Sequence, residues 1–144
     1  MPIKTFRGLI ADGAVDTVSL HTNDGSTGYR IVKLEAMGVR PAATDQESIL
    51  KIYTVDQGTT VTDTVDFSDQ TLIAVCFYDN SNATGVNAVQ TIVIDNVIIN
   101  QDIYITHSEG AGASGVNYYI ALEQIKLDLN ENTVATLKDI RNNA

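Results

Sequence analysis

Side chains able to do acid–base or metal chemistry are few in this chain of 144 residues. Its two histidines, His21 and His107, lie in opposite halves of the chain. A catalytic or metal-binding histidine needs carboxylates or other ligands that the fold holds beside it, and no spacing in the sequence indicates such a set. The sequence therefore favours two isolated surface histidines over a functional pair.

A glycine-rich run, Gly110 to Gly115, matches the G-x-G-x-x-G pattern of dinucleotide-binding folds. In those folds the glycines follow a strand and open a helix, and the N-terminus of that helix holds the pyrophosphate. Here the run leads into Val116–Ile120, a β-branched and aromatic stretch typical of a strand. We therefore predict a flexible hairpin connection at the glycines, and no cofactor.

Acidic side chains occur in groups that are also rich in turn-forming residues. Asp79–Asn82 and Asn23–Gly25 carry oxygen ligands suited to Ca²⁺, but neither has the spacing of an EF-hand loop. Asp63, Asp66 and Asp69 can form a glycosidase pair only if two of them face each other across a cleft. Turns that bond their own backbone explain these groups as well as ligand binding does. We therefore expect no metal site and no catalytic residue, and predict that the chain is not an enzyme.

The elements that position these residues are short β-rich runs separated by Gly, Asn, Asp, Ser and Thr. About eight such runs with almost no helical pattern between them predict an all-β fold, an antiparallel β-sandwich of the jelly-roll type. Residues 38–48, which include Pro41, are the best candidate for the long crossover that a Greek key needs. The expected strands are Lys4–Ile10, Val15–Thr22, Tyr29–Met37, Ile49–Val55, Leu72–Tyr78, Thr91–Ile99, Asp102–Thr106 and Val116–Leu127.

Hydrophobic alternation within these runs predicts which faces are buried. Val32, Leu34 and Ala36 alternate with charged residues, which places them on one face of a half-buried strand. Leu72–Tyr78 is apolar on both faces, so it is predicted to be a central strand. Asp79–Asn87, by contrast, is almost entirely polar or small and is expected to be a long exposed loop.

Two local features interrupt the regular strand pattern. Gly58 is expected to begin a turn, because glycine accepts positive φ without steric cost. In the last run the apolar phase slips between Leu122 and Ile125. Either a β-bulge near Glu123 and Gln124 or a change of partner sheet there explains the slip.

Composition narrows the class of partner and the compartment. The chain carries 18 acidic and 9 basic residues, a net charge of −9, which repels a phosphate backbone, so direct nucleic-acid binding is not expected. Cys76 is the single cysteine and lies in an apolar run, which favours a buried, inert thiol in a reducing cytoplasm. The first residues lack the apolar core of a signal peptide, and no run is long enough to span a membrane. We therefore expect no membrane partner.

Residues 130–144 have a different pattern from the β-rich body, which we assign to residues 1–129 as one domain. Val134, Leu137, Ile140 and Arg141 follow helical spacing, and Asn130 or Asn132 is available as an N-cap. A short helix with one apolar stripe needs a surface to bury against. We predict a C-terminal helical arm in which these four residues form an assembly interface.

A resemblance to known proteins rests on five stretches of the chain: Arg7–Gly13, Asn100–Thr106, Asn117–Gln124, Leu127–Asn130 and Thr133–Arg141. These stretches resemble small virion-type proteins encoded by tailed bacteriophages of marine bacteria. Such proteins are similar to jelly-roll cement or decoration proteins that sit as trimers on an icosahedral shell. The resemblance implies a structural role and a homotrimer, and it carries no family site residues.

From the resemblance we expect a capsid decoration protein that binds major capsid subunits at the outer surface of the virion, after synthesis in the cytoplasm of the host bacterium. The alternative is a phage tail or adhesion module that binds host-surface glycans. Six tyrosines and no tryptophan make the glycan reading weaker, because carbohydrate-binding sandwiches usually display tryptophan among their aromatic platforms.

Overall fold

The computed structural model describes residues 2–21, 26–43, 45–81, 86–94 and 97–127. The predicted arm, with Val134, Leu137, Ile140 and Arg141, lies outside the described residues.

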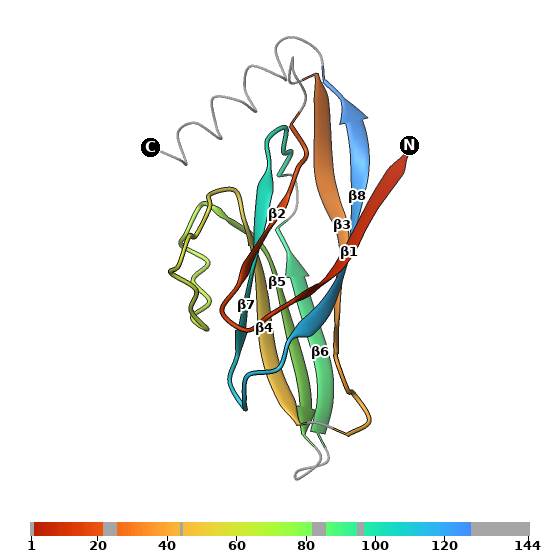
Figure 1. The fold of residues 1–144 in the computed structure, drawn as a ribbon. Coiled ribbons are helices and arrows are strands. Elements are labelled where there is room, and N and C mark those ends of the chain that lie inside the picture. The colour runs from red at the N-terminus through yellow and green to blue at the C-terminus, as the bar shows by residue number, and fades with distance from the viewer. Residues whose placement is uncertain (1, 22–25, 44, 82–85, 95–96, 128–144) are drawn as a thin grey trace.

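The described residues form eight strands in two antiparallel sheets (Figure 1). One sheet has three strands in the order β1-β8-β3, and the other has five in the order β2-β7-β4-β5-β6. The strands are β1 Ile3–Ile10, β2 Val15–Val18, β3 Thr27–Gly38, β4 Gln46–Tyr53, β5 Leu72–Ser81, β6 Val86–Val93, β7 Ile103–Glu109 and β8 Val116–Lys126.

Inward-facing side chains from both sheets form one hydrophobic core. Strand alternation buries Ile120 and Leu122 of β8 against residues such as Leu50 and Ile52 of β4, and all four are fully buried. The prediction of an all-β antiparallel sandwich is confirmed, and the described residues contain no helix.

The finer jelly-roll topology stays a prediction. An eight-stranded jelly roll nests strand 1 beside 8, 2 beside 7, 3 beside 6 and 4 beside 5. Here β1–β8, β2–β7 and β4–β5 form ladders, whereas β6 pairs with β5. β6 also lies near β3, where the Thr91 hydroxyl donates to the Leu34 carbonyl at 3.1 Å.

The connection that contains Pro41 joins β3 in one sheet to β4 in the other, as expected of the crossover. Its path is fixed by the Asn80 side chain, whose Nδ2 donates to the Pro41 carbonyl at 2.6 Å. The predicted turn at Gly58 is also present, with φ of 59° and a backbone N–H that bonds the Asp56 carboxylate at 2.9 Å.

The expected loop Asp79–Asn87 is wrong over its whole described length. β5 continues to Ser81, and β6 begins at Val86 rather than at Thr91, so Asp79 and Asn80 are paired strand residues. The ladder between two adjacent strands outweighs the low β-propensity of Asp and Asn at these positions. Leu72–Tyr78 is a central strand as predicted, with β4 on one side and β6 on the other.

Both explanations of the phase slip near Glu123 and Gln124 are wrong. β8 pairs regularly with β1 as far as Glu123 and with β3 on both sides of Gln124, and it stays in the three-stranded sheet. The irregularity lies on the partner strand β3, where Val32 is the extra residue between Ile31 and Lys33. Val32 is therefore 46% exposed rather than buried on one face with Leu34. A phase slip read from one strand does not reveal which strand of the pair carries the extra residue.

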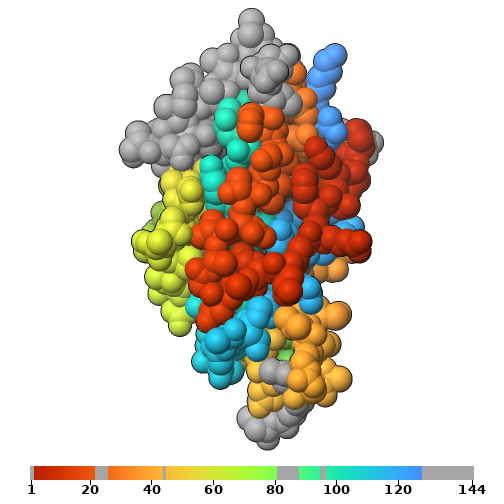
Figure 2. Space-filling view, in the orientation of Figure 1, coloured from red at the N-terminus to blue at the C-terminus, as the bar shows by residue number. Residues whose placement is uncertain are grey.

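Residues 54–71 connect β4 to β5 and lie against the outer face of the five-stranded sheet. A second small core forms beneath them from Ile49, Tyr53, Leu72 and Val75. In Figure 2 this segment appears as the yellow-green bulge at the left of the molecule. The sheet is therefore covered on part of its outer face as well as on its inner face.

Candidate functional site

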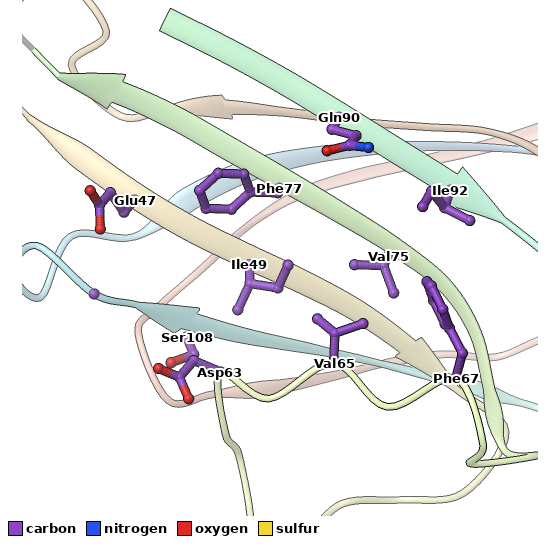
Figure 3. A pocket seen from close by; sticks show the side chains of 11 residues that line it. Glu47, Ile49, Asp63, Val65, Phe67, Val75, Phe77, Gln90, Ile92 and Ser108 are labelled. Carbon is purple, nitrogen blue, oxygen red and sulfur yellow. The ribbon is translucent and has the colours of Figure 1, made fainter. Parts of the chain in front are cut away.

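The strongest candidate site is a groove of about 440 Å³ on the outer face of the five-stranded sheet. Its floor is made by β4, β5 and β6, and residues 63–67 of the β4–β5 connection form one wall (Figure 3). Strand alternation explains the floor, because every second residue of these strands points outward.

The groove is lined mainly by apolar side chains that remain accessible. Phe67 is 54% exposed, Ile92 41%, Val65 40% and Phe77 36%, so four large apolar side chains contact solvent within one site. Figure 3 shows Phe77 and Phe67 toward opposite ends, with Val65 and Val75 between them. Contiguous exposed apolar side chains of this size mark interaction surfaces more often than solvated ones.

Polar side chains lie at the margin of the groove. Glu47 and Asp63 contribute carboxylates, and Gln90 and Ser108 contribute an amide and a hydroxyl. None of the described residues that line the groove is basic. The site therefore favours a ligand that combines apolar groups with hydrogen-bond donors or positive charge.

Lys51 of β4 holds the wall of the groove in place from beneath. Its side chain is almost fully buried, and Nζ donates to the Thr64 carbonyl at 2.7 Å and lies 3.4 Å from the Thr62 hydroxyl. The ammonium also lies 5.6 Å from the centre of the Tyr53 ring. Burial lowers the pKa of Lys51, an effect that the carboxylates of Asp63 and Asp69 partly oppose.

Two of the three acids considered as a glycosidase pair form local turns instead. The Asp66 carboxylate accepts from the Ser68 N–H and hydroxyl at 2.9 and 2.6 Å, and Asp69 accepts from the Thr71 N–H and hydroxyl at the same distances. The hydrogen bonds from Ser68 lower the pKa of Asp66. These turns shape the segment that carries Val65 and Phe67.

His107 is fully buried, so the expectation of a surface histidine is wrong for it. Its Nδ1 lies 3.2 Å from the Ile10 carbonyl, and its Nε2 lies 2.9 Å from the Ser48 hydroxyl. A carbonyl only accepts, so we assign the Nδ1–H tautomer, in which Nε2 accepts from Ser48. The Ser48 oxygen in turn accepts from Gln46 Nε2 at 2.7 Å, which also donates to the Gly115 carbonyl at 2.9 Å.

This chain of hydrogen bonds resembles a serine–histidine pair but lies inside the sandwich. Both Ser48 and His107 are 0% exposed, so neither side chain can reach a substrate in this structure. The network joins β1, β4, β7 and the start of β8, which gives it a structural role.

His21 is on the surface, as expected, and contacts Asp102. Its Nδ1 lies 2.6 Å from Asp102 Oδ1, which also accepts from the backbone N–H groups of Leu20 and His21. Partial burial raises the pKa of Asp102, but the hydrogen bonds from His21 and Leu20 outweigh it, and the net shift is downward. The pair fixes the chain after β2 to the start of β7.

A strand follows the glycine run Gly110–Gly115 rather than a helix, as predicted. The predicted hairpin is wrong, because the run connects β7 in one sheet to β8 in the other, and these two strands do not pair. The Gly110 N–H donates to the Glu47 carbonyl at 2.8 Å. Cys76 is buried, also as predicted, and burial raises the pKa of its thiol.

The sequence missed the groove, although it contained a signal. Val65 and Phe67 are apolar residues in an otherwise polar segment, and Phe77 lies on a strand that is apolar on both faces. Which outward residues stay accessible depends on where residues 54–71 lie, and this is a property of the tertiary fold.

Among the described residues, no three His, Cys, Asp or Glu side chains gather in a way that suits a metal ion. No helix long and apolar enough to span a membrane occurs in them. Neither a scan against protein-family models nor a search of curated proteins finds a match to this chain.

Proposed function

We propose that this protein is a virion structural protein, a capsid decoration protein that binds major capsid subunits at the shell surface. The observation that carries the proposal is the outer-face groove, which combines four exposed large apolar side chains with two carboxylates at its margin. The resemblance described above supports the same role. The proposal makes the groove a protein-binding site and not a catalytic one.

The groove suits a segment of a capsid subunit that presents one or two apolar side chains next to Lys or Arg. Phe67, Phe77 and Ile92 would contact the apolar side chains, and Glu47 and Asp63 would face the positive charge. Lys51 and the turns at Asp66 and Asp69 hold the wall in place before binding. A pre-formed site loses less conformational entropy on binding than a mobile one.

The jelly-roll topology, the homotrimer and the arm belong to the same proposal. Val134, Leu137, Ile140 and Arg141 would join copies of the chain, and the groove would join each copy to the shell. This division leaves the groove free in the trimer.

The test is to incubate the purified protein with phage shells that lack it and to locate it by electron microscopy. Many copies on the shell surface are expected. Phe77→Asp should reduce the amount that sediments with shells at least tenfold, because a carboxylate replaces an apolar contact. Val89→Asp is the matched control, since Val89 is exposed on the neighbouring strand but does not line the groove. Binding that Phe77→Asp leaves unchanged would contradict the role of the groove.

A glycan-binding tail or adhesion module is the second candidate, and one observation favours it. Phe67 and Phe77 offer aromatic faces beside the hydrogen-bonding groups of Gln90, Asp63 and Glu47, which is a combination that sugars use. A few copies at the tail tip, together with binding to a glycan array that Phe77→Asp abolishes, would support this function in place of decoration.

A further inference from the structure

We propose that the outer face of the three-stranded sheet binds the same face of a second copy of this chain, about a two-fold axis that runs along β8. This contact uses a different surface from the groove and does not depend on the proposed function. It goes beyond the predicted trimer, because it requires pairs of chains.

The outer face of this sheet carries exposed apolar side chains around a hollow of about 620 Å³. Leu9 and Met37 are each 59% exposed, and Tyr119 is 37% exposed. They come from β1, β3 and β8, so the apolar surface extends across the full width of the sheet. In Figure 1 these three strands lie side by side on the right of the molecule.

The registers of the two ladders place opposite charges on either side of the central strand. Arg7 of β1 and Glu35 of β3 both pair with Tyr119 of β8, so the three residues form one row. The next row holds Leu9 and Met37, which both pair with Asn117. Paired residues of antiparallel strands point to the same side of the sheet, and all these side chains point outward.

A two-fold axis along β8 turns this arrangement into a self-complementary surface. Rotation about that axis keeps each row at its own height but exchanges its two ends. Arg7 of each copy then faces Glu35 of the other, and Leu9 of each copy faces Met37 of the other. The two Tyr119 side chains meet at the axis. An isologous contact of this kind requires a surface that complements itself, and these rows supply it in charge and in hydrophobicity.

The size of the face predicts a weak contact. Three strands about 4.8 Å apart and eight residues long at about 3.4 Å per residue make a face of roughly 400 Å² before side-chain relief. Stable interfaces bury about 800 Å² on each partner, so we expect association in the micromolar to millimolar range. Glu35 already lies 3.3 Å from the Lys33 ammonium, but both groups are more than half exposed and can rearrange.

The experiment is a charge exchange, read out as average molar mass by light scattering over a range of concentrations. The full chain should form even-numbered species. Arg7→Glu and Glu35→Arg should each halve the mass, because each places like charges opposite one another twice.

An equal mixture of the two variants should restore the mass, since the carboxylate introduced in one variant then faces the guanidinium introduced in the other. The unchanged Glu35 of the first variant and the unchanged Arg7 of the second are paired in the same way. Arg40→Glu is the matched control, as Arg40 is exposed outside the rows.

Each alternative outcome has a distinct meaning. A monomer at every concentration overturns the two-fold contact. A three-copy species that Arg7→Glu leaves unchanged also overturns it, while the predicted trimer stands. If the full chain forms a dimer but the equal mixture of the two variants does not restore the dimer's mass, the two-fold axis does not run along β8. Shell binding is measured separately, so a failure of this inference is distinguishable from a failure of the proposed function.

Discussion

At the scale of single residues, buried polar side chains stabilise the fold both inside the sandwich and beneath the segment on its outer face. His107 hydrogen-bonds the Ile10 carbonyl and Ser48, and Lys51 fixes the segment that forms the groove wall. Sequence spacing placed His107 on the surface because a lone histidine gives no sign of its partners. Ser48, its hydrogen-bond partner, is brought beside it only by pairing of β4 with β7.

As the pH is lowered, protonation of His107 should reduce the free energy of unfolding before carboxylates become protonated. Burial lowers the pKa of His107 from 6.5, although the Ala11 and Ile10 backbones and the charges of Asp12 and Glu109 oppose this in part. The unfolded chain therefore binds a proton more readily than the folded one. Stability is fully present above about pH 6.5 and falls as the pH decreases through that value.

Urea unfolding followed between about pH 7.5 and pH 5 measures this effect. The midpoint should fall with pH in the natural chain and in His21→Gln. In His107→Gln the unfolding free energy at pH 7.5 should be lower by about 1–3 kcal/mol, and the midpoint should change less with pH. A pH dependence that His107→Gln leaves intact would assign the effect to another group.

At the scale of elements, one tyrosine ties the two sheets together. Tyr118 of β8 points inward, and its hydroxyl donates to Asp16 of β2 at 2.9 Å, across from one sheet to the other. Burial, with Asp16 contributing, raises the pKa of Tyr118 to about 12. The ring fits because Gly8 of β1 lacks a side chain, since a Cβ there would lie 2.8 Å from the tyrosine oxygen.

Gly8→Ala should therefore destabilise the fold by about 1–3 kcal/mol through overpacking. The measurement is a double-mutant cycle by urea unfolding with Tyr118→Phe, which removes the oxygen that the new Cβ meets. Tyr118→Phe alone should also destabilise, because Asp16 loses its donor. The double variant should be more stable than the sum of the two single changes predicts. Additive effects would show that the strand pair moves apart without strain.

The strands show which structural features hydrophobic periodicity predicts and which it does not. Leu72–Tyr78 was predicted as a central strand because both of its faces are apolar, and β5 is central. Asp79 and Asn80 were predicted as loop because their propensity is low, yet pairing with β6 makes them strand. Val32 is predicted on the buried face because the sequence of β3 contains no signal for the bulge between Ile31 and Lys33. The groove and the charge rows depend on strand order and register, which periodicity does not specify.

At the scale of the whole molecule, the two outer faces of the sandwich have different chemistry. The five-stranded sheet carries the groove with Glu47 and Asp63, and the three-stranded sheet carries the rows with Arg7 and Glu35. If both proposed interaction surfaces form, the sandwich can contact two partners at once. This arrangement would suit the proposed role of linking subunits, in which the predicted arm would be a third means of contact.

Deleting residues 130–144 tests the division between body and arm. The core joins strands of both sheets, including Ile120 and Leu122 of β8, so the truncated chain should remain folded with a strand-rich circular dichroism spectrum. If Val134, Leu137 and Ile140 are buried in an interface, they would contribute on the order of 5 kcal/mol before ordering entropy is subtracted, which is enough to stabilise that interface. The truncated chain should therefore lose the trimer or its binding to shells in light scattering and sedimentation.

It should still pair through the β8 face, and Arg7→Glu in the truncated chain should abolish that pairing. Unfolding on truncation would instead make the arm part of the core, and unchanged assembly would place the trimer contact on the sandwich itself.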